Sequence, residues 1–156
     1  MKAFILILTG LMLLGLRPLP AEDYPGLNDP LKTATLQYLL IDKQLVADSF
    51  DGINAAALAM KAAVSSAPAG TFPGDFAQAV DTLAAAKDIR EARTAFAPVS
   101  SGLIATLTKD KVATGKLYSA YCPMRKAYWV QTDSKVIQNP YFGSQMLDCG
   151  VIKSNF

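Results

Sequence analysis

The helical architecture expected for this chain follows from the stretch DPLKTATLQYLLIDKQL, residues 29–45. Asp29 stands where an N-cap is expected, and Pro30 stands at the first helical position, where its missing N–H costs nothing. Apolar side chains then recur at steps of three and four residues, at Leu31, Ala34, Tyr38, Ile41 and Leu45. This spacing places them on one face of a helix. The stretch therefore predicts an amphipathic helix over residues 30–47.

Three further stretches show the same helical spacing, and they predict helices over residues 49–66, 75–87 and 89–108. Asp48 is the expected cap of the second helix, and Asp88 with Glu91 forms a capping-box-like pair for the fourth. Pro98 lies inside the fourth helix and is expected to bend or interrupt it. Four amphipathic helices joined by short loops predict an all-α fold, an antiparallel four-helix bundle.

The last part of the chain, residues 115–156, differs in composition. Residues 115–121 and 128–131 are aromatic and partly alternating, which predicts short extended segments. The segment is too short to build its own core, so it is expected to pack on the bundle through Trp129, Tyr141 and Phe142. The expected domain thus spans residues 22–156, a four-helix bundle with a short C-terminal lobe of extended segments and turns.

Residues 1–21 have the layout of a secretory signal peptide. Lys2 precedes an apolar run from Ala3 to Leu16, and cleavage is expected after Ala21. The run is shorter than the roughly 20 apolar residues of a membrane-spanning helix. A periplasmic or secreted protein without a membrane span after cleavage is therefore expected, an uncleaved anchor being the alternative.

Composition excludes several classes of function. Removal of the leader takes away Lys2 and Arg17 and no acidic residue, so the formal net charge falls from +2 to zero. A neutral domain without a basic run argues against binding to nucleic acid. The chain has no histidine, which removes the commonest general base and the commonest transition-metal ligand. The cysteines are not spaced as Cys-x-x-Cys, and no Gly-rich phosphate loop is present, so an enzyme is not expected.

Two short clusters hold four sulfur side chains: Tyr121-Cys122-Pro123-Met124, and the segment 139–150 with Met146 and Cys149. Two interpretations of them stay open. Soft sulfur ligands select Cu(I) or Ag(I), so Cys122, Met124, Met146 and Cys149 form one candidate metal site. In an exported protein the two cysteines would equally form a disulfide that stabilises the fold.

Other conspicuous residues have simpler interpretations. Asn139, before Pro140, is interpreted as a turn residue. Arg90 and Arg93, on either side of Glu91, are interpreted as part of a solvated helix face.

The tail resembles a known bacterial family. The pattern consists of Tyr121 to Met124, then Trp129, then Ile137 to Gly150, and Tyr38, Leu45-Val46, Asp48 and the Ala-rich second helix also fit. On these residues the chain resembles the family called domain of unknown function 3347, which consists of exported helical domains. Some members are fused to periplasmic adaptor subunits of efflux pumps for copper and silver. Arg125-Lys126 departs from the family pattern, where small or acidic residues are commoner.

The resemblance implies a role in heavy-metal handling, with the four sulfur residues at the matching positions. The expected function is a periplasmic accessory protein of copper or silver handling or efflux, which binds the soft metal ion or an efflux adaptor protein. The alternative is a disulfide-stabilised structural or protein-interaction module without a metal role.

Overall fold

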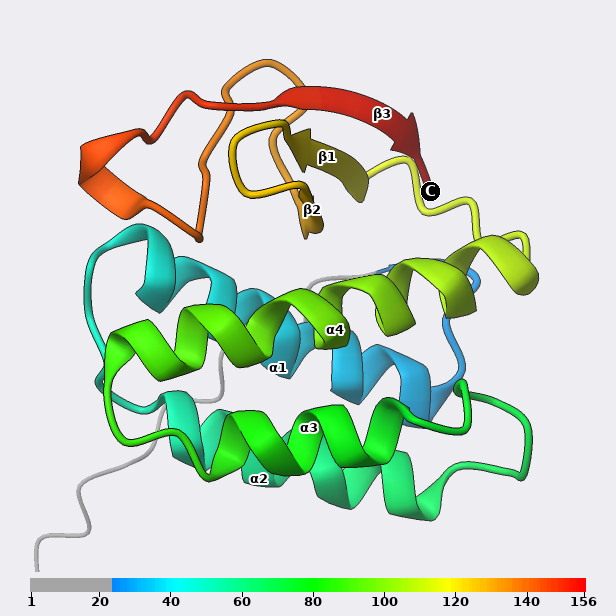
Figure 1. Cartoon of the computed structure of the whole chain (residues 1–156). Helices are drawn as coiled ribbons and strands as arrows, with labels where there is room; N and C mark the ends of the chain where they lie inside the picture. The colour runs from blue at the N-terminus through cyan, green and yellow to red at the C-terminus, as the bar shows by residue number, and fades with distance from the viewer. Residues whose placement is uncertain (1–23) are drawn as a thin grey trace, which may run out of the picture.

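Four helices and a small sheet form the fold (Figure 1). The structure is a computed structural model that describes residues 24–156, so the expected leader lies outside the described residues. The helices are α1 (Asp29–Val46), α2 (Ile53–Ser66), α3 (Phe76–Ala84) and α4 (Ile89–Lys109). The strands are β1 (Tyr118–Cys122), β2 (Ala127–Gln131) and β3 (Val151–Asn155), and a short 3-10 helix, η1, covers Gly143–Gln145. Within residues 24–156, none of the helices is both long and apolar enough to cross a membrane.

The expectation of an all-α four-helix bundle is wrong, because the C-terminal lobe contains a three-stranded antiparallel sheet. Its strand order is β2-β1-β3, so the central strand β1 pairs with both neighbours. The two segments expected to be extended became β1 and β2. The third strand, β3, lies close to the chain end and has mostly exposed side chains. Without alternating burial it left no periodic signal in the sequence.

The elements form three layers. In Figure 1, α1 and α4 lie between the sheet above them and the pair α2 and α3 below them. The predicted apolar stripe of α1 faces the interior, since Leu31, Ala34, Tyr38, Ile41 and Leu45 are all buried. Full burial of a large apolar side chain contributes about 1.5–3 kcal/mol, so this stripe is a substantial part of the core.

The helix ends differ in part from the expected caps. Asn28, not Asp29, caps α1, and its Oδ1 accepts the Leu31 N–H at 3.1 Å. Asp88 caps α4 as expected and accepts the Glu91 N–H at 2.8 Å. Asp48 does not cap α2, which begins after Gly52, a residue with a left-handed φ of 75°. The Asp48 carboxylate is therefore free to contact other parts of the chain.

The lobe packs on the helices through a buried hydroxyl group. The Tyr38 hydroxyl on α1 lies 2.7 Å from the Ser100 hydroxyl on α4 and accepts the Val130 N–H of β2 at 3.0 Å. The residue before Val130 in this strand, Trp129, is fully buried and packs against Gly150. A Cβ at position 150 would collide with the indole ring, so the position requires glycine.

Asp42 is a buried acid on the same helix face as Tyr38. It is 7% exposed, and among the described residues its Oδ1 has no hydrogen-bond partner. Burial raises the pKa of its carboxyl group well above the ordinary value of 3.8, because the charged form loses its hydration. The phenols of Tyr38 and Tyr141 lie near enough to interact with it electrostatically, and neither supplies a positive charge.

Asp42 is therefore expected to destabilise the protein as the pH rises. Below pH 3.8 the group is protonated in both the folded and the unfolded chain. Between pH 3.8 and the raised pKa, only the unfolded chain releases the proton, so the free energy of unfolding falls. Asp42→Asn should be more stable than the wild type at neutral pH, by about 1.4 kcal/mol for each unit of pKa shift. Denaturant titrations at several pH values measure this, with exposed Asp51→Asn as the control. Equal pH profiles for Asp42→Asn and the wild type would contradict it.

Candidate functional site

The fold brings Cys122 and Cys149 together. Cys122 ends β1 and is fully buried, and Cys149, two residues before β3, is half-buried. Their Sγ atoms lie 3.5 Å apart, and both thiols are free. The expectation of a disulfide is therefore wrong, since a bonded pair would have its sulfur atoms about 2.0 Å apart. The contact is a hydrogen bond between two thiols.

The turn that follows β1 directs hydrogen-bond donors at one of the two sulfurs. The four residues 123–126 connect β1 to β2, and the Arg125 N–H donates to Cys122 Sγ with N and S 3.4 Å apart. The Met124 N–H, the Asn139 side chain and the Cys149 thiol also donate to it. Burial opposes the thiolate, but together these donors outweigh it and lower the pKa of Cys122 below its ordinary value.

The pKa of Cys149 shifts in the opposite direction from that of Cys122. Its hydrogen bond to Cys122 raises its pKa, and burial adds to the effect. The first proton to leave the pair therefore comes from Cys122, and the Cys149 S–H then donates to the resulting thiolate. Two thiols in contact, one of them with a lowered pKa, have the chemistry to act as a nucleophile or to ligate a soft metal ion, and the chain has no histidine that would compete for either role.

The two methionines are less closely associated with this pair. The Met124 side chain is 66% exposed, although its backbone N–H approaches both sulfurs. Met146 is half-buried after η1, and its carbonyl accepts the Cys149 N–H at 3.1 Å. Within residues 24–156, no three His, Cys, Asp or Glu side chains gather as a metal cluster. The structure thus brings Cys122 and Cys149 into contact, and a metal site that also includes Met124 and Met146 stays a prediction.

Asn139 belongs to this site, although the sequence suggested only a turn. It is fully buried, and its Nδ2 donates to the Cys149 carbonyl at 2.6 Å while the side chain also reaches the Cys122 sulfur. Its Oδ1 accepts the Tyr141 N–H at 2.8 Å. A single amide group thereby holds both cysteines in position. The only sequence signal for this role was the position of Asn139 in the tail motif.

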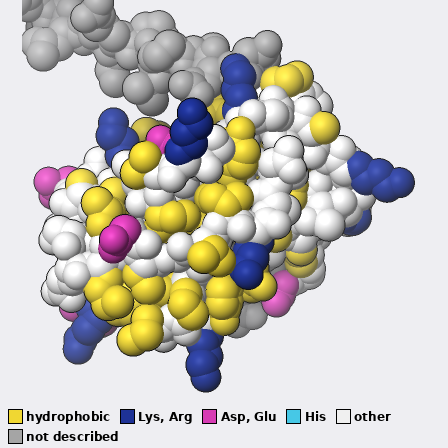
Figure 2. Space-filling view, turned by 90° about the horizontal axis from the view of Figure 1, so that it is seen from above, with side chains coloured by type: hydrophobic (Ala, Val, Ile, Leu, Met, Phe, Trp, Pro, Cys, Tyr) yellow, Lys and Arg dark blue, Asp and Glu magenta, His cyan; other side chains and the backbone are white. Residues whose placement is uncertain are grey.

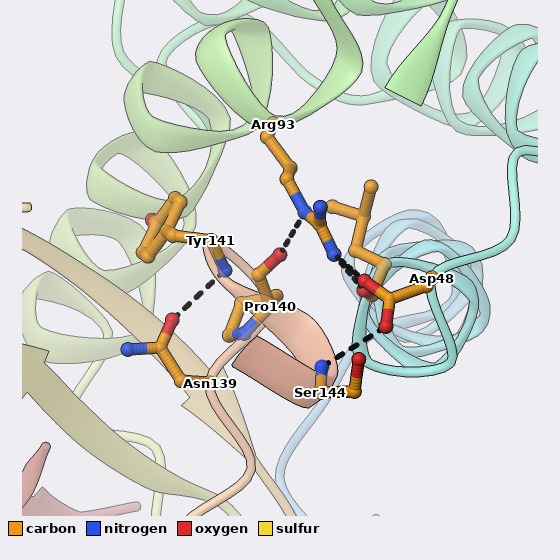
Figure 3. A network of polar contacts seen from close by, with 7 residues as sticks. Asp48, Arg93, Asn139, Pro140, Tyr141 and Ser144 are labelled. Carbon is orange, nitrogen blue, oxygen red and sulfur yellow. Dashed lines mark hydrogen bonds and ion pairs between the residues drawn. The ribbon is translucent and has the colours of Figure 1, made fainter. Parts of the chain in front are cut away.

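Arg93 fixes the loop that carries Asn139 (Figure 3). The interpretation of Arg93 as a solvated residue is wrong, because its side chain is only 16% exposed. It donates to the Pro140 carbonyl at 2.9 Å, to the Leu45 carbonyl at 2.7 Å and to the Asp48 carboxylate at 2.6 Å. Its acceptors are mostly backbone carbonyls, which no side-chain pattern can indicate.

The Asp48 carboxylate binds both Arg93 and the start of the lobe's 3-10 helix, η1. Its second oxygen accepts the Ser144 N–H at 3.0 Å, so the carboxylate joins the end of α1 to η1. The hydrogen bonds from Arg93 and Ser144 lower the pKa of Asp48 to about 2. This contribution to stability is complete above the ordinary pKa of 3.8 and is lost as the pH falls towards 2.

Removal of the Arg93 guanidinium is expected to loosen the lobe. Arg93→Ala leaves the Pro140 carbonyl without its donor and removes one donor from the Leu45 carbonyl, which also accepts the Asp48 N–H. The substitution should lower the free energy of unfolding by about 2–4 kcal/mol. Arg90→Ala, three residues earlier on the same helix and 87% exposed in its side chain, is the matched control and should change it by less than about 0.5 kcal/mol. Denaturant unfolding measures both. Equal effects of the two substitutions would show that Arg93 has no special role.

Replacement of Asn139 is expected to change the chemistry of the thiols. Asn139→Ala removes a donor to Cys122, so the pKa of that thiol should rise, and the unpaired Cys149 carbonyl should cost about 1–3 kcal/mol of stability. Thiolate ultraviolet absorbance against pH, in a Cys149→Ser background, measures the first effect, and denaturant unfolding measures the second. Exposed Asn155→Ala is the control. A loss of stability without any change in the pKa of Cys122 would show that Asn139 has only a structural role.

Comparisons with known proteins add no assignment to this geometry. No family model matches the chain, and no curated protein or solved structure matches it significantly. The resemblance to the domain of unknown function 3347 therefore stays a prediction from the tail motif. The functional interpretation rests on the thiol pair and the groups around it.

Proposed function

We propose that this protein is an accessory protein of copper or silver handling, and that the Cys122 and Cys149 thiols bind Cu(I) or Ag(I). The observation that carries the proposal is the contact of the two free thiols, whose Sγ atoms lie 3.5 Å apart, in a chain without histidine. Thiolates are the ligands that soft monovalent ions prefer, and such ions accept as few as two of them. A larger ligand cluster is not required.

The surroundings of the thiols suit such an ion. A monovalent cation held by two thiolates carries a net charge of −1. The N–H groups of Met124 and Arg125 and the Asn139 amide, which already donate to Cys122, would stabilise that charge. The same donors favour loss of the Cys122 proton, which metal binding requires. Arg125, unusual for the family that the tail resembles, is compatible with a site whose loaded form is anionic.

The proposal also includes a location outside the cytoplasm and a protein partner. The signal-like segment 1–21 supports a periplasmic or secreted location. The resemblance of residues 121–124 and 137–150 to domains fused to efflux adaptors supports an adaptor protein of a metal efflux system as the partner. In this role the protein would hold the ion outside the cytoplasm and deliver it for export.

The test is Cu(I) retention by the reduced protein. Anaerobic competition with a chromophoric Cu(I) chelator should show one ion bound by the wild type. Loss of a group that only orients a ligand typically costs about 10–100-fold in affinity, so loss of a ligand in Cys122→Ser or Cys149→Ser should cost more than about 100-fold. Circular dichroism of each variant establishes that it is folded.

Methionine variants then define the ligand set. Met124→Leu and Met146→Leu should weaken Cu(I) binding only if their thioethers are ligands, whereas buried Met60→Leu is the control with unchanged affinity. Retention of the ion by the Cys122→Ser variant with wild-type affinity would refute the thiol pair as the site. Failure of the reduced wild type to retain Cu(I) or Ag(I) would refute the proposal as a whole.

A further inference from the structure

Exposed apolar side chains are concentrated on the C-terminal lobe. The large hydrophobic residues that stand out from the surface are Leu58 on α2 and five residues of the lobe: Met124, Tyr128, Val136, Leu147 and Val151. Met124 lies at the tip of the turn between β1 and β2, and Tyr128 and Val151 are 42% and 48% exposed. A protein surface that exposes several large apolar side chains together commonly marks an interaction site.

The strand register makes part of this set contiguous. Tyr121 in the central strand lies opposite Tyr128 on one side and Val151 on the other. The rings of Tyr121 and Tyr128 are 4.6 Å apart between centroids. Cys122 and Ala127 form the next pair along, and the turn with Met124 follows directly. We call Tyr121, Met124, Tyr128 and Val151 the lobe patch.

Basic residues surround the lobe patch. Arg125 and Lys126 are exposed in the turn beside Met124, and Lys153 Nζ lies 5.8 Å from the centre of the Tyr121 ring. Figure 2, which views the molecule from the sheet side, shows hydrophobic side chains gathered on this face with Lys and Arg side chains projecting around them.

The charge of the whole lobe has the same sign. Residues 111–156 carry two acidic residues, Asp133 and Asp148, and six basic ones, all of them exposed: Lys111, Lys116, Arg125, Lys126, Lys135 and Lys153. Residues 24–110 carry more acidic than basic residues. The charge of residues 24–156 is therefore polarised, with a net +4 in the lobe and a net −2 in residues 24–110, and the positive end lies at the lobe patch.

The geometry points to an anionic lipid surface as the occupant of the lobe patch: we propose that the lobe binds the headgroup region of a negatively charged bilayer peripherally. The apolar side chains protrude singly from a turn and from sheet strands. Two surface grooves of the described residues lie instead between helices, one along α1 and α2 and one along α3 and α4. Helical and proline-rich segments of protein partners dock into grooves, whereas a bilayer interface accepts protruding apolar and tyrosine side chains with basic residues beside them.

Vesicle co-sedimentation tests the proposal. The exported protein, with its N-terminus established by mass spectrometry and identical in every variant, is mixed with vesicles of phosphatidylcholine alone or with about one third phosphatidylglycerol. The wild type should bind the anionic vesicles, bind the neutral ones far more weakly, and dissociate as salt is added. Absence of binding to the anionic vesicles would overturn the proposal and leave the patch to a protein partner.

Matched variants locate the binding surface. Each basic residue near an anionic surface contributes about fivefold to the partition coefficient. The triple variant Arg125→Gln, Lys126→Gln, Lys153→Gln should therefore weaken vesicle binding by more than about tenfold. The triple variant Lys61→Gln, Lys87→Gln, Arg90→Gln removes the same charge from the helices and should bind almost as the wild type does. Equal losses in the two triple variants would overturn the assignment to the lobe.

The apolar contribution and the thiols are tested separately. Met124→Ser with Tyr128→Ser leaves the charge unchanged and should also weaken vesicle binding, since two anchoring side chains are lost. Full binding by this folded variant would overturn a role for the apolar residues. Cys149→Ser should bind vesicles as the wild type does, because the thiols lie outside the lobe patch. The lipid test thus gives its answer whether or not the thiols bind a metal ion.

Discussion

The Arg93 guanidinium on α4 connects two parts of the structure that are far apart in the sequence, the end of α1 with Asp48 and the lobe. Its hydrogen bonds reach the end of α1, the Asp48 carboxylate and the Pro140 carbonyl in the lobe. The planar group can make these contacts at once because its donors point in fixed, divergent directions. The segment after Pro140 leads to Cys149, so the position of one thiol depends on this contact. The site is therefore built as much by α4 as by the sheet that contains Cys122.

Two acids of similar position in the sequence have opposite effects on stability. Asp48 has partners that favour its charge, and burial deprives Asp42 of water without giving Oδ1 a partner among the described residues. At neutral pH the charge on Asp48 therefore stabilises the folded chain, whereas the buried carboxyl group of Asp42 lowers its stability. The fold tolerates that cost because Tyr38, Phe96 and Trp129 bury a large apolar area in the core. Asp42 has no evident structural benefit.

The sequence indicated the helical part of the fold better than the lobe. The α1 stripe was legible because Leu31, Tyr38 and Leu45 repeat with the helical period, and each is buried. The third strand was not, since Val151–Asn155 is an edge strand whose side chains are mostly exposed. Its pairing with β1 depends on backbone hydrogen bonds, which leave no trace in residue types. The error in fold class follows from the pairing of all three strands into a sheet, of which the sequence indicated only two extended segments.

The sequence also indicated the candidate site only in part. The tail motif singled out the two cysteines that meet, but the lowered pKa of Cys122 depends on N–H groups and on Asn139, which a sequence does not place in space. Arg93 gave no signal because it binds backbone carbonyls more than forty residues away. Side-chain patterns report which residues are apolar, and they say little about which backbone groups a polar residue reaches.

The meeting of Cys122 and Cys149 also has a thermodynamic consequence. The two residues are 27 positions apart and become neighbours only when the sheet and the Asn139 loop are formed. Any ligand that needs both sulfurs therefore binds the folded chain and has no equivalent site on the unfolded one. By linkage, its binding free energy adds to the folding free energy, and a hundredfold excess over the dissociation constant would add about 2.7 kcal/mol. Ligand binding at the two thiols and folding of the domain are therefore thermodynamically coupled.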